Sequence, residues 1–192
     1  MKKFELTNEF ITNMFGTKLF RIRALVEFGD VEAGELGGYV EKESNLGHDD
    51  NAWVYDNAWV YGNVRVYGDA QVSGDARVYD NAWVYGDAQV SGDARVCGNA
   101  RVYGDARVCG NGDYAYAHGF GSVNRTTTFF RLKDGGVGVR CGCFYGTLAQ
   151  FRDKIRETHG ESAIAEEYLD LAALMEKRFR RTGNEQKTEE ES

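Results

Sequence analysis

Residues 51–110 read NAWVYDNAWVYGNVRVYGDAQVSGDARVYDNAWVYGDAQVSGDARVCGNARVYGDARVCG. Ten valines recur in this stretch at intervals of six residues, from Val54 to Val108. The position two residues before each of them is alanine nine times and valine once. A six-residue period predicts a parallel β-helix, in which one small unit stacks repeatedly on itself. Three units make one triangular coil of about 18 residues.

Side-chain alternation predicts which residues face into this coil and which face out. In Ala76-Arg77-Val78-Tyr79, Ala76 and Val78 share one face of the strand, and Arg77 and Tyr79 share the other. The alanine and valine rows therefore fill the interior. The Gly/Asp and Asp/Asn pairs between strands tolerate positive φ and hydrogen-bond to a turning backbone, so they form the corners.

The run NAWVYGDAQVSGDARVCGNARVYGDARV resembles the hexapeptide-repeat, left-handed parallel β-helix proteins. More broadly, the repeats resemble uncharacterised proteins of bacteriophages and prophages. This broader similarity also includes the opening GTKLFRIRALVEFGDVEAGELGGYVEKESNL and the closing TTTFFRLKDGGVGVRCGCFYGTLAQF. The first resemblance implies the fold. Neither implies a particular chemistry, because one fold hosts many activities.

The expected fold is mainly β: a three-sided left-handed parallel β-helix with an N-terminal β cap and a C-terminal hairpin plus two helices. The expected parts are a cap at 1–45, the β-helix at 46–122, a hairpin–helix–helix module at 123–181 and a disordered tail at 182–192. Winding is expected to begin near Gly37, because Val40 and Leu46 continue the six-residue phase of the alanine row. Past the regular repeat, the same lattice places Tyr114 and Phe120 in the valine row, as a plug.

The C-terminal module has its own local signals. Residues 126–132 and 137–144 predict a hairpin that turns at 133–136. Thr147 is the expected N-cap of a short helix that ends at Gly160. A second helix follows, with an apolar stripe that runs from Ile164 to Phe179.

Composition narrows the function classes. The formal net charge of −7 argues against binding duplex nucleic acid, which requires a basic surface. No apolar run approaches the roughly 20 residues that cross a bilayer, and the start lacks a signal peptide's apolar stretch. The expected location is the cytoplasm, that of the host if the protein is phage-encoded. The four cysteines show no metal-ligand spacing, so no metal or cofactor is predicted.

Catalysis is weakly indicated. Hexapeptide β-helices are often trimeric acyltransferases with a histidine between subunits, and this chain has only His48, His118 and His159. These three are not expected to converge, so no catalytic residue is assigned. An acyltransferase-like enzyme using His118 stays an alternative, in which a carboxylate would have to set the histidine tautomer. The other reading of His118 is a residue that satisfies backbone groups at the end of the coil.

The outward positions are the candidate binding residues. Because residues one coil apart stack, arginines and aromatic rings line up on two faces of the coil. The predicted site residues are Tyr61, Arg77, Tyr79 and Arg95 on one face, and Arg65, Tyr67, Trp83, Tyr85, Arg101 and Tyr103 on another. Guanidinium groups pair with phosphates and aromatic faces stack on bases, so either set is suited to a small nucleotide. The same ladders also stabilise adjacent coils without any ligand.

Residues 51–110 contain neither lysine nor glutamate. Surfaces rich in arginine and aromatics and poor in these two residues are typical of protein interfaces. A homo-oligomer is therefore expected, most simply a trimer. The favoured function is a non-enzymatic binding protein that counters a host defence, either by sequestering a small nucleotide signal or by binding a host protein. A purely structural rod or virion component is the third hypothesis.

Overall fold

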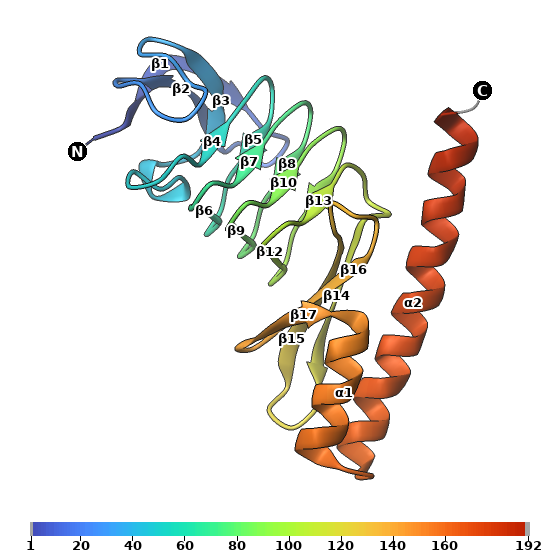
Figure 1. Cartoon of the computed structure of the whole chain (residues 1–192). Helices are drawn as coiled ribbons and strands as arrows, with labels where there is room; N and C mark the ends of the chain where they lie inside the picture. The colour runs from blue at the N-terminus through green and yellow to red at the C-terminus, as the bar shows by residue number, and fades with distance from the viewer. Residues whose placement is uncertain (1, 191–192) are drawn as a thin grey trace. The chain divides into compact units, whose positions relative to one another are not determined.

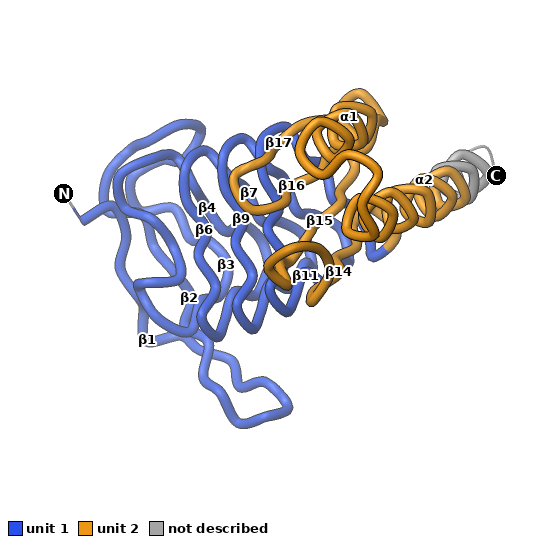
Figure 2. Tube along the Cα trace, turned by 90° about the horizontal axis from the view of Figure 1, so that it is seen from below, with its two compact units in different colours: residues 1–111 blue, residues 112–192 orange. Residues whose placement is uncertain are grey.

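The computed structural model describes residues 2–190, with side chains described as far as Thr182. The chain forms two compact units, residues 1–111 and residues 112–192 (Figure 2).

The first unit is a three-sided β-solenoid (Figure 1). The first face consists of β4 (Trp53–Val54), β7 (Gln71–Val72), β10 (Gln89–Val90) and β13 (Arg107–Val108). The second face contains β5 (Trp59–Val60), β8 (Arg77–Val78) and β11 (Arg95–Val96). The third face consists of β6 (Arg65–Val66), β9 (Trp83–Tyr85) and β12 (Arg101–Tyr103). Neighbouring strands are parallel and lie one coil apart in sequence, as in the pairs Arg77↔Arg95 and Trp83↔Arg101. The predicted three-sided solenoid and its register are confirmed.

The interior holds the two aliphatic rows, as predicted. All ten valines and the ten residues of the upstream row are at most 1% exposed. Small inward side chains let the three sheets approach one another, and the backbone N–H groups of each coil donate to carbonyls of the next. Arg77 N to Ala94 O, at 2.9 Å, is typical.

Corners turn through left-handed backbone conformations. Gly68 has φ +72°, and a Cβ there would lie 3.0 Å from the backbone nitrogen of Gly86. Asp80, like Asp56, takes the same kind of conformation, with φ 64°, at a position that several other corners fill with glycine. Its carboxylate accepts a hydrogen bond from Gly98 N at 3.1 Å, one coil later. The side-chain bond to the next coil compensates for the unfavourable φ of a non-glycine residue.

The first coil departs from the predicted register. β3 (Leu36–Val40) pairs in parallel with β5, placing Val40 opposite Val60, and Leu46 bridges Val66. Val40 and Leu46 therefore stack on the valine row, and their predicted phase with the alanine row is wrong. The cause is an insertion in the segment between Leu46 and Val54, which makes the first coil two residues longer than the regular coils. This insertion displaces the first coil from the uniform lattice.

The N-terminal residues extend one solenoid sheet. β1 (Phe4–Thr12) and β2 (Lys18–Ala24) form an antiparallel hairpin, and the sheet order is β1-β2-β3-β5-β8-β11. Phe4 and Ile22 are fully buried. The short helix η1 (Glu43–Asn45) follows β3. The expected N-terminal β cap is therefore an antiparallel extension of this sheet.

The second unit is a four-stranded antiparallel sheet with two helices. Its elements are β14 (Tyr114–Phe120), β15 (Arg125–Arg131), β16 (Val137–Cys141), β17 (Phe144–Thr147), α1 (Leu148–His159) and α2 (Ala163–Glu190). Tyr114 pairs with Phe130 in this sheet. Tyr114 therefore belongs to this sheet, and the predicted plug is wrong. The first unit ends at residue 111, so the predicted end of the β-helix at 122 is corrected. A seven-residue strand with large alternating side chains suits an antiparallel hairpin partner better than a short solenoid side.

The hairpin of β15 and β16 and the helix start at Thr147 are as predicted. The Thr147 side chain accepts from Gln150 N, and Gly160 is the C-cap of α1. Phe129, Phe151, Tyr168 and Phe179 belong to the core between sheet and helices. Helix α2 continues to Glu190 through most of the segment predicted as a disordered tail, whereas residues 191–192 lie outside the described residues.

Candidate binding groove on the solenoid

The second solenoid face carries Tyr61, Arg77, Tyr79 and Arg95, as the repeat register predicted. The guanidinium of Arg77 lies 4.2 Å from the ring centroid of Trp59, and the rings of Tyr61 and Tyr79 stack at 5.3 Å with an interplanar angle of 7°. A hydrogen bond with Cys97, together with burial, raises the pKa of Tyr79 to about 12. Burial also raises the pKa of Tyr61. These contacts link one coil to the next and need no ligand to form.

The third face brings its six predicted residues into two adjacent columns. In the first column, Arg65 and Arg101 lie over the Trp83 ring at 5.5 and 4.9 Å. In the second column, hereafter the tyrosine column, Tyr67, Tyr85 and Tyr103 follow one another at centroid distances of 4.9 and 4.5 Å. Tyr85, at the centre of this column, is only 8% exposed. The centre of the face is thus closed by its own rings.

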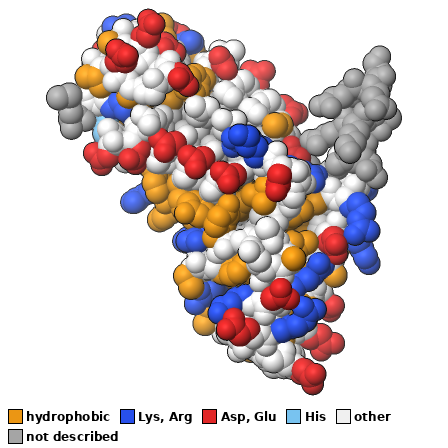
Figure 3. All heavy atoms as spheres, viewed as in Figure 1, with side chains coloured by type: hydrophobic (Ala, Val, Ile, Leu, Met, Phe, Trp, Pro, Cys, Tyr) orange, Lys and Arg blue, Asp and Glu red, His pale blue; other side chains and the backbone are white. Residues whose placement is uncertain are grey.

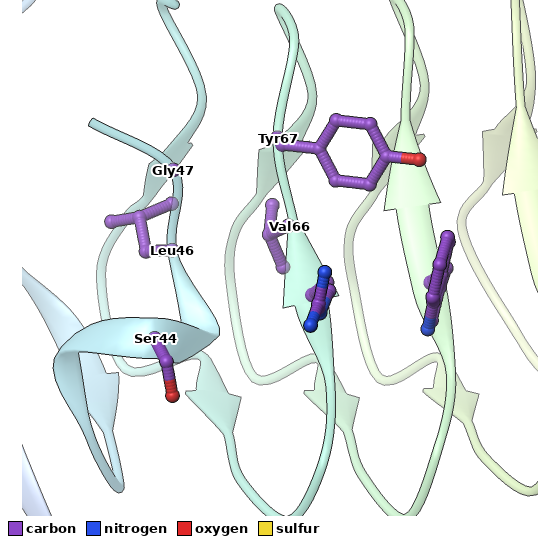
Figure 4. Close-up of a pocket in the computed structure, with 7 residues that line it drawn as sticks. Ser44, Leu46, Gly47, Val66 and Tyr67 are labelled. Atoms are coloured by element: carbon purple, nitrogen blue, oxygen red, sulfur yellow. The ribbon is translucent and has the colours of Figure 1, made fainter. Parts of the chain in front are cut away.

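The end of this face toward the N-terminus is open. A groove of about 430 Å³ is lined by Ser44, Leu46, Gly47, Arg65, Val66, Tyr67 and Trp83 (Figure 4). Three predicted site residues therefore meet in one groove, whereas Tyr85, Arg101 and Tyr103 lie along the face beyond it. The lining residues outside the predicted set are Val66, from the inward valine row, and Ser44, Leu46 and Gly47, from the first coil. Recognising the two-residue insertion would have aligned Leu46 with Val66 and so found them.

The groove combines a cationic, a polar and an aromatic lining. Arg65 is exposed and supplies a cation, Ser44 supplies a hydroxyl, and Tyr67 and Trp83 supply aromatic surface. Within the described part of the chain, neither a carboxylate nor an imidazole lines this groove, so these residues supply no general base there. Figure 3 shows hydrophobic side chains gathered in a band along the solenoid, beside a row of acidic side chains.

His118 lies outside this groove. It belongs to β14 in the second unit, where its Nδ1 lies 2.9 Å from the hydroxyl oxygen of Thr126. Among the described residues, no three or more His, Cys, Asp or Glu side chains gather as a metal site.

A second, polar pocket of about 220 Å³ surrounds Lys3, which the sequence did not single out. The Lys3 ammonium donates to the carbonyls of Asp50 and Ala52 and lies 4.5 Å from the Phe28 ring centroid. Burial lowers the pKa of Lys3 to about 8, against the opposing effect of nearby aspartates. The lysine ties the N-terminus to the inserted segment of the first coil, which is a structural role.

Comparison with known proteins supports the solenoid. A family model described as YdcK beta solenoid repeat matches residues 70–86, 88–100 and 94–110, all within the regular coils. No curated protein matches the chain. The described part of the chain has no helix with the length and apolarity that a bilayer crossing requires.

Proposed function

We propose that this chain is a non-enzymatic binding protein, and that the groove lined by Arg65, Tyr67 and Trp83 binds a small anionic ligand of the nucleotide class. The observation that carries the proposal is the meeting of an exposed guanidinium with aromatic surface in one concave site. Arg65 also lies over the Trp83 ring, and the same residue types contact one another farther along the third face.

The groove has the size and polarity of a small-molecule site. Its volume of about 430 Å³ falls in the range of ligand pockets. A guanidinium pairs with phosphate oxygens through two parallel hydrogen bonds, and an aromatic face stacks on any nucleobase. Because none of the described residues that line the groove is a carboxylate, a phosphate there meets no like charge from its walls.

The biological role in this proposal follows from the resemblance to phage and prophage proteins. A stoichiometric binder in the host cytoplasm would remove a nucleotide signal from circulation without chemistry. Assembly as a homo-oligomer, with a trimer favoured, is part of the proposal and is supported by the absence of lysine and glutamate from residues 51–110. Binding of a host protein to the same arginine-rich and aromatic surface is the second candidate.

Isothermal titration with nucleoside monophosphates, triphosphates and cyclic nucleotides tests the proposal. Arg65→Ala is expected to weaken binding by about ten- to a hundred-fold, because a charge-assisted hydrogen bond contributes about 1.5–3 kcal/mol. Arg95→Ala, an exposed arginine on the second face, is the matched control and is expected to leave affinity unchanged. Absence of heat with every nucleotide, or equal losses in the two variants, would refute nucleotide binding in this groove.

Native mass spectrometry of protein purified from its host reports subunit number and any retained small molecule together. A trimer that carries a nucleotide is the expected result. Recovery of the chain in purified virions with no ligand would instead support the structural hypothesis.

A further inference from the structure

The tyrosine column stops one coil short of the solenoid's first coil. Gly47 N donates to Val66 O at 2.8 Å, just as Tyr67 N donates to Val84 O at 3.1 Å. Leu46 bridges Val66 in the same register. Gly47 therefore occupies the position that corresponds to Tyr67, Tyr85 and Tyr103 in the following coils, and it contributes no ring.

The adjacent column ends at the same coil for a different reason. Asn45 precedes Leu46 as Arg65 precedes Val66, but its side chain is fully buried. The Asn45 amide donates to the carbonyls of Gly62 and Val64, and its oxygen accepts from Lys42 N. The side chain that would extend the column of Arg65, Trp83 and Arg101 is thereby held inside the coil.

Gly47 and Asn45 thus leave both columns without an outward side chain in the first coil. From this we infer that the groove is a vacant ring position, which a nucleobase fills by stacking on Tyr67 as the next member of the tyrosine column. This inference rests on the proposed function and specifies how the ligand is held. In Figure 4 the ring of Tyr67 reaches away from Gly47, while Leu46 and Ser44 lie on the opposite side of the groove. Gly47 lies one coil before Tyr67, so the position that precedes Tyr67 in the column carries no side chain.

The same geometry selects a ligand class. The described residues of the groove offer one ring position and one guanidinium, that of Arg65, so the groove matches one base and one phosphate group. A mononucleotide satisfies both. A cyclic dinucleotide would place its second base outside the groove, away from this ring position. Stacking is tolerant of base identity, so purine and pyrimidine monophosphates are expected to differ only modestly.

Filling the position with the protein's own ring is the sharpest test. Gly47 is not in the left-handed region, and a Cβ there would lie 3.2 Å from the Tyr67 Cβ, so Gly47→Tyr requires a shift of a few tenths of an ångström. Gly47→Tyr is expected to extend the column and to reduce affinity for AMP and CMP by more than ten-fold. The circular dichroism spectrum is expected to stay unchanged.

Removing the stacking platform is the complementary test, which does not depend on how Gly47→Tyr folds. Tyr67→Leu is expected to weaken mononucleotide binding by about ten-fold, since stacking on an aromatic side chain contributes about 1–3 kcal/mol per base. Tyr103→Leu, at the other end of the same column, is the matched control and is expected to change affinity by less than two-fold.

The outcomes separate this inference from the proposed function. If the wild-type protein binds no nucleotide, the proposed function fails and the inference fails with it. If the wild-type protein binds nucleotides in a manner that depends on Arg65, and Tyr67→Leu and Tyr103→Leu behave alike, the vacant ring position is wrong while the proposed function stands. Tighter binding of a cyclic dinucleotide than of AMP would also overturn the choice of ligand class.

Discussion

The first coil of the solenoid and the regular coils differ in what their outward positions present. On the third face, rings and guanidinium groups of the regular coils meet counterparts in the next coil, as Trp83 meets Arg101. In the longer first coil the corresponding positions hold Gly47 and the inward-turned Asn45. The regular repeat thus closes its own surface, and the departure from the repeat opens a groove. In the proposed function, the binding groove therefore lies where the first coil departs from the repeat.

The largest effect is expected at the buried amide of the first coil. Asn45→Ala removes the donor to Gly62 O and Val64 O and the acceptor for Lys42 N, and unsatisfied buried groups cost about 1–3 kcal/mol each. A loss of about 3 kcal/mol in the free energy of unfolding is expected in urea denaturation.

Asn63→Ala is the matched control from a regular coil, because its side chain pairs with Asn81 at an exposed corner. It is expected to lose less than about 1 kcal/mol. Equal losses in the two variants would show that the buried amide does not hold the first coil in its distinct shape.

A smaller effect is expected from overfilling a regular coil. Ala88 is fully buried in the alanine row, so Ala88→Leu forces extra volume between closely packed sheets and should cost roughly 1–3 kcal/mol. Thermal denaturation measures the loss. The control is Gln89→Leu, one position away and facing outward, which is expected to leave the melting temperature nearly unchanged. If Ala88→Leu melts at the same temperature as wild type, the inward placement of this row is wrong.

The smallest effect is a pH dependence carried by Lys3 in the first coil. Its pKa of about 8 in the folded chain lies below the ordinary 10.5, so the unfolded chain binds more protons between these pH values. The free energy of unfolding should therefore rise with pH in this window. Asp49, Asp50 and Asp69 favour the charged form and oppose the shift.

Lys3→Met removes this titration, so the difference in stability between wild type and Lys3→Met should change between pH 8 and 10.5 and level off outside it. Tyrosines with a raised pKa, such as Tyr79, make the free energy of unfolding fall at high pH. Their contribution is the same in both proteins, so it cancels in the difference. A difference that stays constant over this range would mean that Lys3 has an ordinary pKa.

Much of the solenoid was predictable because its signal is periodic. The inward burial of Val78, the pairing of Arg77 with Arg95 and the column of Arg65, Trp83 and Arg101 all follow from a constant six-residue spacing. The helix start at Thr147 was predictable for another reason, since a capping residue acts on its own first turn.

The rest of the candidate site was not predictable from that spacing. Extending the lattice backward put Leu46 in the wrong row, because a single insertion of two residues shifts every position before it. Extending it forward put Tyr114 in a plug, although the residue pairs with Phe130 in a different sheet. Lys3 carried no sequence signal, because its surroundings come from residues far along the chain, such as Asp50 and Ala52.

The sequence alone determined the repeating unit, its inward and outward rows and the residue types displayed on each face, because these depend on alternation along a strand and on a constant period. Only the tertiary structure decided where coiling begins, which coil leaves the tyrosine column without a ring, and which strands leave the solenoid for the second unit. These outcomes depend on contacts between segments distant in the chain, such as Leu46 with Val66, whose register an insertion changes without altering the local pattern on either side.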